Sequence, residues 1–344
     1  MTGQRWLALA GLLVFLLIAG GCETHSELQA AADNYSTRLA RSLDQPAPDI
    51  AWPGAFPMPP PRDLQVPVPE TSIDLLDFLR LYDCPLHSVI AEKNSSLGRL
   101  AVESQDLFLQ VAFLREVDGC IESLPAEHTE LRETLDRARD AKTEALPAYI
   151  WRATLGADEF RQFWRRDASS GYPADADPRM ELAVGDLLAL SRELLAGDYE
   201  LDESRFTDAL AVVRLGEGGE LLDAWRIVAA SLAVANTTVE GRIADRPLCY
   251  EGMVTPKSQV FRNVVLNYFV GDVQVRAASL DQRFFALMPV VRELEKLLSP
   301  GEPATYRQWR GARNKLFTSA RSSLPAHVES LAPLMQQCGF LPAG

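Results

Sequence analysis

Cys22 is the residue whose type and position point most directly to a chemical modification. It follows the apolar run Leu16 to Ala19 and two glycines, Gly20 and Gly21. Glycines are small enough to enter a signal peptidase, and a thiol directly after the cut can form a thioether bond to a lipid. We therefore expect cleavage before Cys22 and lipid attachment at its sulfur.

The residues before Cys22 have the composition of a signal peptide. Arg5 and the amino terminus supply a positive region, and Trp6 to Ile18 supply an apolar segment of the usual length. A membrane-spanning helix needs about 20 apolar residues, so this segment is short for a permanent span. The alternatives are an uncleaved anchor and secretion with an unmodified cysteine. Because the pattern resembles the lipobox of bacterial lipoproteins, it favours residues 1–21 as a lipoprotein signal peptide.

Glu23 determines the expected destination. An aspartate after the lipidated cysteine typically retains a lipoprotein in the inner membrane, and this chain has Glu23 instead. Each buried methylene of an acyl chain contributes about 0.8 kcal/mol, and more than one chain makes anchoring stable. We expect a lipid-anchored protein at the periplasmic face of the outer membrane, with that membrane as its first partner.

Four further cysteines remain in the mature chain: Cys84, Cys120, Cys249 and Cys338. An even number in an oxidising compartment favours two disulfides. Metal binding is disfavoured because no two of them have the C-x-x-C spacing and the four histidines do not cluster around them. Three connectivities are possible. The favoured one joins Cys84 to Cys120 and Cys249 to Cys338, since sequential pairing closes local units and ties down the carboxyl terminus.

An aromatic, arginine-rich segment is the candidate ligand-binding site. Its principal residues are Trp151, Arg161, Trp164 and Arg165. Its further members are Phe160, Phe163, Tyr172, Arg152 and Arg166. Aromatic faces and guanidinium groups together could hold a sugar ring or an anionic ligand. The alternative, which this composition at helical spacing favours, is a hydrophobic core with arginines along its rim.

Two smaller groups have chemistry-bearing side chains. Carboxylates at Asp175, Asp177, Glu181 and Asp186 could offer oxygen ligands to calcium, but the EF-hand spacing is absent, and acids near a helix amino terminus explain them better. His128 lies beside Glu127 and Glu130, and His327 lies near the carboxyl terminus. A histidine and a carboxylate can do acid–base chemistry, yet acids are favoured at a helix start in any case.

The sequence contains no established catalytic motif. There is no H-E-x-x-H, G-x-S-x-G, S-x-x-K, Walker or G-x-G-x-x-G pattern, and Gly216, Gly218 and Gly219 indicate a turn. We therefore predict no catalytic residue, no metal and no cofactor, and the sequence favours a non-enzymatic protein over an enzyme.

The charge balance excludes one class of partner. The signal peptide contains one arginine and no acid, so the mature chain has 33 basic (34 minus 1) and 47 acidic residues, a net charge of −14. A chain that acidic is a poor partner for polyanions. We expect no nucleic-acid binding.

The elements that must position these residues are helices and one proline-rich segment. Residues 22–45 form one amphipathic helix after the anchor, and residues 46–70 contain nine prolines and favour extended backbone. A free tether would be polar, but this segment contains Trp52 and Phe56. We therefore expect a strap packed on the domain surface; a docking ligand for a partner's aromatic groove is the alternative.

Residues 71–344 show helical periodicity throughout, so the expected fold is all-α: an irregular multi-helix bundle or array, braced by disulfides and preceded by the strap. It forms either one domain or two subdomains with a break near residues 168–179. Ser279 and Gln282 suggest a capping box that begins a helix, and two separate helices are expected after the Ser299-Pro300-Gly301 turn.

Several segments resemble a known family. They are Leu75 to Leu79 with Cys84, the run from Ile90 to Gly98, Ser104 with Cys120, and the second-half residues Leu248, Cys249, Pro256 and Val273 to Val275. They are similar to a family of Gram-negative (proteobacterial) lipoproteins, domain of unknown function 3080. The resemblance implies lipidation and paired cysteines, and it transfers no activity.

Three functions follow as hypotheses. The leading one is a non-enzymatic binding or scaffolding component of the cell envelope, which holds another envelope protein or a cell-wall component. The alternative is a lipoprotein that binds a small ligand or glycan through the aromatic and arginine cluster. A peptidoglycan hydrolase is third. A polar cleft near Trp164 would favour the second or third, and an apolar groove or flat patch would favour the first.

Overall fold

The computed structural model describes residues 27–69, 75–166 and 178–341 of the chain. Cys22, Glu23, Tyr172, Asp175 and Asp177 lie outside the described residues. Within those three ranges the regular elements are all helical and no strand occurs. The predicted all-α class is confirmed.

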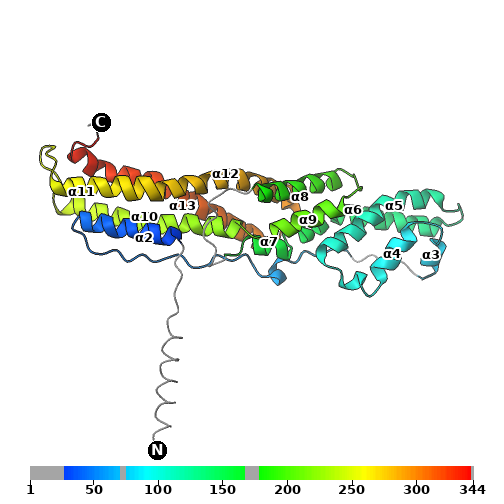
Figure 1. Ribbon diagram of the computed structural model, residues 1–344. Coiled ribbons are helices and arrows are strands. Elements are labelled where there is room, and N and C mark those ends of the chain that lie inside the picture. The colour runs from blue at the N-terminus through cyan, green and yellow to red at the C-terminus, as the bar shows by residue number, and fades with distance from the viewer. Residues whose placement is uncertain (1–26, 70–74, 167–177, 342–344) are drawn as a thin grey trace, which may run out of the picture.

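One half of the molecule is a bundle of long helices, which we call the body (Figure 1). Its elements are α2 (Glu27–Ser42), α10 (Gly218–Asp245), α11 (Pro256–Val264), the π-helical segment η3 (Val265–Val273), α12 (Gln274–Leu297) and α13 (Ala304–Gln337). α2 packs against α10 on one side and against α11 and η3 on the other, and α10 packs against α13. Tyr35 and Phe269 are among the fully buried side chains at its centre.

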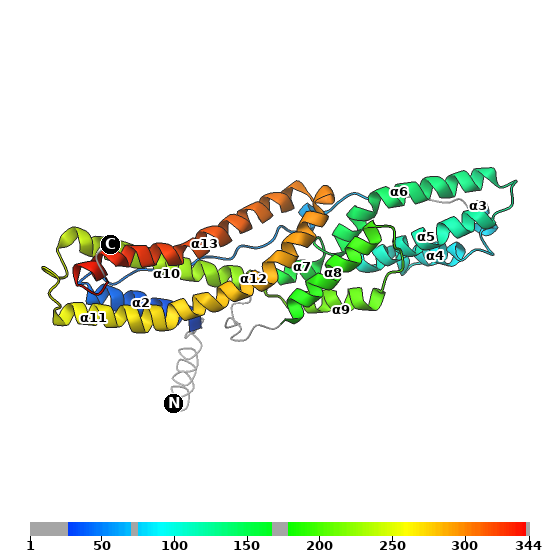
Figure 2. The ribbon, with the colours of Figure 1, turned by 90° about the horizontal axis from the view of Figure 1, so that it is seen from above.

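The other half is a narrower arm, and the molecule is elongated as a result (Figures 1 and 2). The arm contains α3 (Leu75–Arg80), α4 (Leu86–Asn94), η2 (Gly98–Leu100), α5 (Glu103–Ser123) and α6 (Thr129–Ala153). Between arm and body lie α7 (Asp158–Phe163), α8 (Arg179–Leu195) and α9 (Glu203–Val213). A single cluster of buried apolar residues extends from Leu28 to Cys338 through all three regions.

Two disulfides brace the array, one in each half. Cys84 bonds to Cys120, with Cα atoms 5.7 Å apart, and fastens the start of α4 to the end of α5. Cys249 bonds to Cys338, with Cα atoms 5.1 Å apart, and fastens the loop after α10 to the end of α13. These are the two pairs that the sequence favoured.

The proline-rich strap connects the end of α2 to the start of the arm and contains one turn of 3₁₀ helix, η1 (Pro61–Leu64). Met58 and Leu64 are buried, and Trp52 and Phe56 pack against the core. The guanidinium group of Arg226 donates a hydrogen bond to the Gly54 carbonyl oxygen at 2.8 Å. The strap is therefore packed along the molecule, as its apolar residues predicted.

Two expected helix boundaries are wrong. Ser279 does not begin a helix, because α11, η3 and α12 are continuous and the Ser279 hydroxyl donates to the Val275 carbonyl oxygen one turn earlier, at 3.4 Å. The two helices expected after residue 301 are one, α13, with Pro325 and Pro333 inside it. Each proline removes one backbone hydrogen bond, but the helix buries Phe317, His327 and other side chains on both sides of the prolines, and that burial offsets the loss.

Across the parts of the chain that the structure describes, no helix is both long and apolar enough to cross a bilayer.

Candidate functional site

The candidate site lies where α7 meets the amino-terminal end of α10. Gly216 has a left-handed backbone with φ of 83°, which turns the chain between α9 and α10. A Cβ atom at Gly218 would clash with the ring of Phe163, and one at Gly219 would clash with the carbonyl oxygen of Trp164. Glycine is required at these two positions because the start of α10 touches the end of α7 directly.

A pocket of about 460 Å³ opens at this junction, and the strap forms its other wall. We call it the strap pocket. Strap residues 55–61 face the end of α7 and the first turns of α10 across it. Its polar lining is Arg161, Gln162, Arg165, Arg166, Asp223 and Arg226, and its apolar lining includes Phe56, Met58, Trp164 and Leu222. Four positive charges and one negative charge therefore line a pocket in a chain whose net charge is −13.

Two of the four arginines hold the strap in place. Arg166 pairs with Asp223 at 3.0 Å and donates to the Pro53 carbonyl oxygen at 3.4 Å. Arg226 lies 3.8 Å from the other oxygen of Asp223 and donates to the Gly54 carbonyl oxygen. Burial raises the pKa of the Asp223 carboxyl group, and the two guanidinium groups oppose that shift. Among the described residues, Asp223 Oδ1 has no hydrogen-bond partner.

The other two arginines are more available to a ligand. Arg165 is exposed and makes one long hydrogen bond to Gln162 Oε1, at 3.4 Å. Arg161 is half-buried and pairs with Asp158 one turn earlier on α7. Guanidinium groups bind carboxylate, sulfate and phosphate groups through paired N–H donors. Arg161 and Arg165 can therefore bind an anion at the mouth of the pocket.

The predicted tryptophans do not form a stacking platform. Trp164 lines the pocket but is only 2% exposed, and the guanidinium group of Arg313 lies 4.4 Å from the centre of its ring. Trp151 is fully buried, meets Tyr306 edge to face, and does not line the pocket. The structure thus brings Arg161, Trp164 and Arg165 together and places Trp151 in the core.

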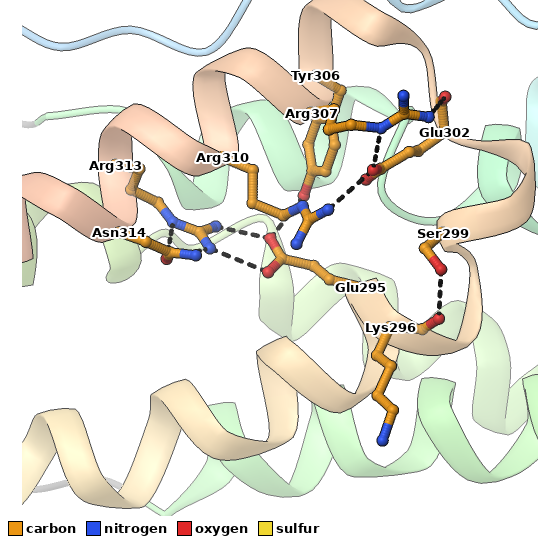
Figure 3. A network of polar contacts seen from close by, with 9 residues as sticks. All are labelled: Glu295, Lys296, Ser299, Glu302, Tyr306, Arg307, Arg310, Arg313 and Asn314. Carbon is orange, nitrogen blue, oxygen red and sulfur yellow. Dashed lines mark hydrogen bonds and ion pairs between the residues drawn. The ribbon is translucent and has the colours of Figure 1, made fainter.

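Arg313, which lies over the Trp164 ring, belongs to a buried polar network that sequence patterns did not predict. Figure 3 shows this network. Arg313 donates to both carboxylate oxygens of Glu295, at 2.7 and 2.9 Å, and the Tyr306 hydroxyl donates to the same group at 2.8 Å. All three side chains are at most 1% exposed. Burial, and next the Glu295 charge, raises the pKa of Tyr306 well above its usual value. Beside this group, Arg307 and Arg310 both donate to Glu302 at 2.8 Å.

A second pocket, of about 150 Å³, lies in the arm between α4, α5 and α6. Lys142 lines it, lies over the ring of Phe113 at 4.9 Å and donates to Gln110 Oε1. Burial lowers the pKa of the Lys142 ammonium group to about 8. Its lining is otherwise mainly apolar, and Lys93 at its edge pairs with Asp106 at 2.5 Å.

Two of the carboxylates considered as calcium ligands have structural partners. Glu181 pairs with Arg283 at 2.7 Å, and Asp186 pairs with Arg205 at 2.6 Å, so neither carboxylate is free for calcium. His128 precedes the first residue of α6. Within the described ranges, no three histidine, cysteine, aspartate or glutamate side chains are grouped so that they could hold a metal ion.

Sequence inspection missed Asp223 and Arg226. They lie three residues apart at the start of α10, about 60 residues after the arginines in and just after α7. The sequence did contain a signal for them: Asp223 and Arg226 lie on the same side of a helix as Gly219 and Leu222. Charged side chains on an otherwise apolar helix face usually pair with other groups, so this pair indicated a polar contact.

The fold and the site define a class: an elongated, all-helical, disulfide-braced protein with an arginine-lined pocket beneath a proline-rich strap. The chain belongs to the family described as Protein of unknown function (DUF3080), whose model matches residues 32–342. This confirms the predicted resemblance to domain of unknown function 3080. No curated protein and no solved structure matches the chain.

Proposed function

We propose that the mature chain is a lipid-anchored, non-enzymatic binding protein of the cell envelope, and that the strap pocket holds an anionic small molecule or glycan fragment. The strap pocket itself carries the proposal. Pockets for small molecules usually measure about 300–1,000 Å³ and combine apolar walls with a few charged groups. The strap pocket has that size and that lining.

The charge of the lining selects the ligand class. An acidic protein repels anions over most of its surface, so a local excess of arginine concentrates binding at one place. Arg161 and Arg165 would contact the anionic group, while Arg166, Arg226 and Asp223 keep the strap closed over the apolar wall. Because Trp164 is covered by Arg313, we assign recognition to charge and shape rather than to stacking on a sugar ring.

The binding experiment compares two arginine variants. The probe is a mixture of muropeptides, which carry carboxylates on a glycan, and the measurement is isothermal titration calorimetry with the mature chain. We expect the double variant Arg161→Ala, Arg165→Ala to raise Kd at least 10-fold, because two charge-assisted contacts are lost. The matched control is Arg205→Ala. It removes an exposed arginine of α9 that pairs with Asp186 of α8 and lies outside the strap pocket. No binding by the parent chain, or equal Kd for both variants, would refute the assignment of this pocket.

Lipid anchoring at Cys22 is the second part of the proposal. It is supported by the apolar run, the two glycines and Glu23. Replacing Cys22 by Ala should release the protein from the outer-membrane fraction into the periplasmic fraction, as measured by fractionation of the envelope on a density gradient. A Cys22→Ala chain that stays in the outer membrane as tightly as the parent would show that another feature anchors it.

A scaffolding function is the second candidate, and one observation at the far end of the arm favours it. Leu76, Leu79 and Tyr82 are 67%, 56% and 75% exposed, and exposed apolar side chains close together often mark protein contacts. Complementation of a deletion strain distinguishes the two functions. Loss of complementation by Leu76→Glu with Leu79→Glu, but not by the arginine variant, would favour scaffolding.

A further inference from the structure

The most exposed residues on the outward surface of the continuous helix α11–η3–α12 are uncharged over a long stretch. We call this surface the uncharged face. Twelve residues between 263 and 289 are exposed, and none of them is charged. They are Asn263, Leu266, Asn267, Val270, Gly271, Val275, Ala278, Ser279, Gln282, Phe285, Ala286 and Pro289.

Large apolar side chains are part of the uncharged face. Leu266 is 41% exposed, Val270 is 42%, Val275 is 57% and Phe285 is 61%. The uncharged face is long, because the 26 residue-to-residue steps from 263 to 289 extend over about 39 Å of helix at 1.5 Å per step. It is therefore a strip rather than a single exposed residue of the kind that any protein shows.

Three charged side chains, those of Asp272, Arg276 and Asp281, border the uncharged face, are 36–40% exposed and are paired. Asp272 accepts a hydrogen bond from Arg276 at 2.7 Å, and Asp281 accepts one from Arg321 at 2.6 Å. The contrast with α6 is clear, since its exposed residues include Glu130, Glu133, Arg137, Asp140 and Glu144. In a chain of which 24% is charged, the uncharged face departs from the rest of the surface.

The start of α2 lies beside the middle of the uncharged face. Glu27 pairs with Arg276 on α12 at 3.8 Å, and Arg38 lies over the ring of Tyr268 on η3 at 4.3 Å. Cys22 is five residues before Glu27, so an extended backbone separates them by at most about 18 Å. A lipid on Cys22 would therefore enter a membrane close to this helix.

We infer that the uncharged face rests on the phospholipid surface in which the Cys22 lipid is embedded; this rests on the anchoring proposed above. Three observations support a lipid surface as the occupant. The short connection to Cys22 brings the face to the bilayer, the acids that border it are paired with arginines, which limits repulsion by anionic headgroups, and the exposed valines and Phe285 can enter the interfacial region. The elongated molecule then lies along the membrane instead of standing on it.

The experiment measures which surface meets the lipid. The lipidated full chain is reconstituted into vesicles of phosphatidylethanolamine and phosphatidylglycerol that contain a brominated lipid as quencher. An environment-sensitive fluorophore is attached to a single added cysteine, in variants Val270→Cys and Val275→Cys. The matched control is Thr237→Cys, an exposed position on α10, the helix that packs on the other side of α2.

We expect quenching at residues 270 and 275 to be at least threefold stronger than at residue 237. Equal quenching at all three positions in vesicle-bound protein would refute the contact between the uncharged face and the membrane, while leaving lipid anchoring intact. Chain that does not float with the vesicles would refute anchoring, and the membrane contact with it. If residues 270 and 275 are protected from the quencher, and this protection increases with protein concentration, the uncharged face binds a second copy of the chain and the proposal is overturned.

Discussion

His327 has two close polar partners inside the body. Its Nε2 atom lies 2.6 Å from the Tyr35 hydroxyl, and its Nδ1 atom lies 2.5 Å from Asn236 Oδ1. Because an amide oxygen only accepts, Nδ1 carries the proton and Nε2 accepts from Tyr35. Burial lowers the pKa of His327 to about 4 and raises that of Tyr35. Both side chains are therefore neutral in the folded protein at neutral pH.

The His327 pKa makes stability depend on pH in one direction. The folded value of about 4 lies below the unfolded value of 6.5, so the unfolded chain takes up the proton first as the pH falls. The stability that comes from keeping His327 neutral is fully present above pH 6.5 and is lost as the pH falls toward 4. The loss in the free energy of unfolding is about 3 kcal/mol. Urea unfolding of the mature chain at pH 7.5, 5.5 and 4.5 measures it. His327→Gln should reduce the fall in unfolding free energy over this range; an identical fall in parent and variant would contradict the assignment.

The Glu295–Arg313 pair gives a second prediction about single residues. Arg313→Met would leave the buried Glu295 carboxylate without its bidentate partner. We expect the free energy of unfolding to fall by about 3–5 kcal/mol, the usual cost of leaving one charge of a buried pair uncompensated. Arg192→Met is the matched control, since Arg192 pairs with Glu293 at 3.4 Å with both side chains about half exposed, and it should change stability by less than about 1 kcal/mol. Chemical denaturation compares them, and equal effects would mean that the buried pair is not essential to the fold.

Among the elements, the two disulfides should contribute similar stabilities. They enclose sequence separations of 36 and 89 residues. The chain-entropy model gives about 4 and about 4.5 kcal/mol for loops of these lengths. We expect Cys84→Ala with Cys120→Ala, and Cys249→Ala with Cys338→Ala, each to lower the unfolding free energy by about 4 kcal/mol. The control is the parent chain in reductant, which should be destabilised more than either variant. A variant as stable as the oxidised parent would contradict this.

The strap should resist proteolysis while its contacts are intact. Phe56 stacks on Trp309 with ring centres 6.1 Å apart, and the Thr305 hydroxyl donates to the Asp63 carbonyl oxygen at 2.5 Å. A protease needs several residues of detached backbone, so cleavage follows local opening. Phe56→Ala should increase the rate of tryptic cleavage after Arg62 several-fold, as measured by gel electrophoresis and mass spectrometry. Leu215→Ala, which shortens an exposed side chain, is the control and should leave the rate unchanged.

At the level of elements, the sequence predicts what depends on local pattern. Helices such as α5 and α8 follow from apolar periodicity, and Trp52 and Phe56 predict the packed strap. Local signals fail where tertiary burial outweighs them, as in α13, which continues through Pro325 and Pro333. They also do not show which helix faces meet. Arg161 and Arg165 were found as candidates, but Asp223 and Arg226 come from a distant helix, and the Glu295–Arg313 pair occupies positions where charge is normally excluded.

The whole molecule should scatter as a rod. α13 has 34 residues and α6 has 25, which makes them about 51 and 38 Å long, and they lie in opposite halves of the molecule. A compact chain of 323 residues (344 minus 21), the length proposed after cleavage before Cys22, would have a radius of gyration of about 20 Å, whereas a rod of their combined length has about 26 Å or more. Small-angle X-ray scattering on the chain without residues 1–21 distinguishes these values. A radius of gyration near 20 Å would show that the arm packs against the body in solution and that the molecule is not elongated.

The packing of α2 has a consequence for the order in which the protein can assemble. Tyr35 on α2 meets His327, 292 residues later in the chain. At about 5–20 residues per second, synthesis of that interval takes about 15 to 60 s. The other partners of α2, which are α10, α11 and η3, are synthesised earlier, but the contact with α13 can form only once residue 327 is present. Contacts between such distant residues also slow folding itself. The packing of α2 is therefore completed late in folding, and until then part of its apolar surface is exposed to aggregation.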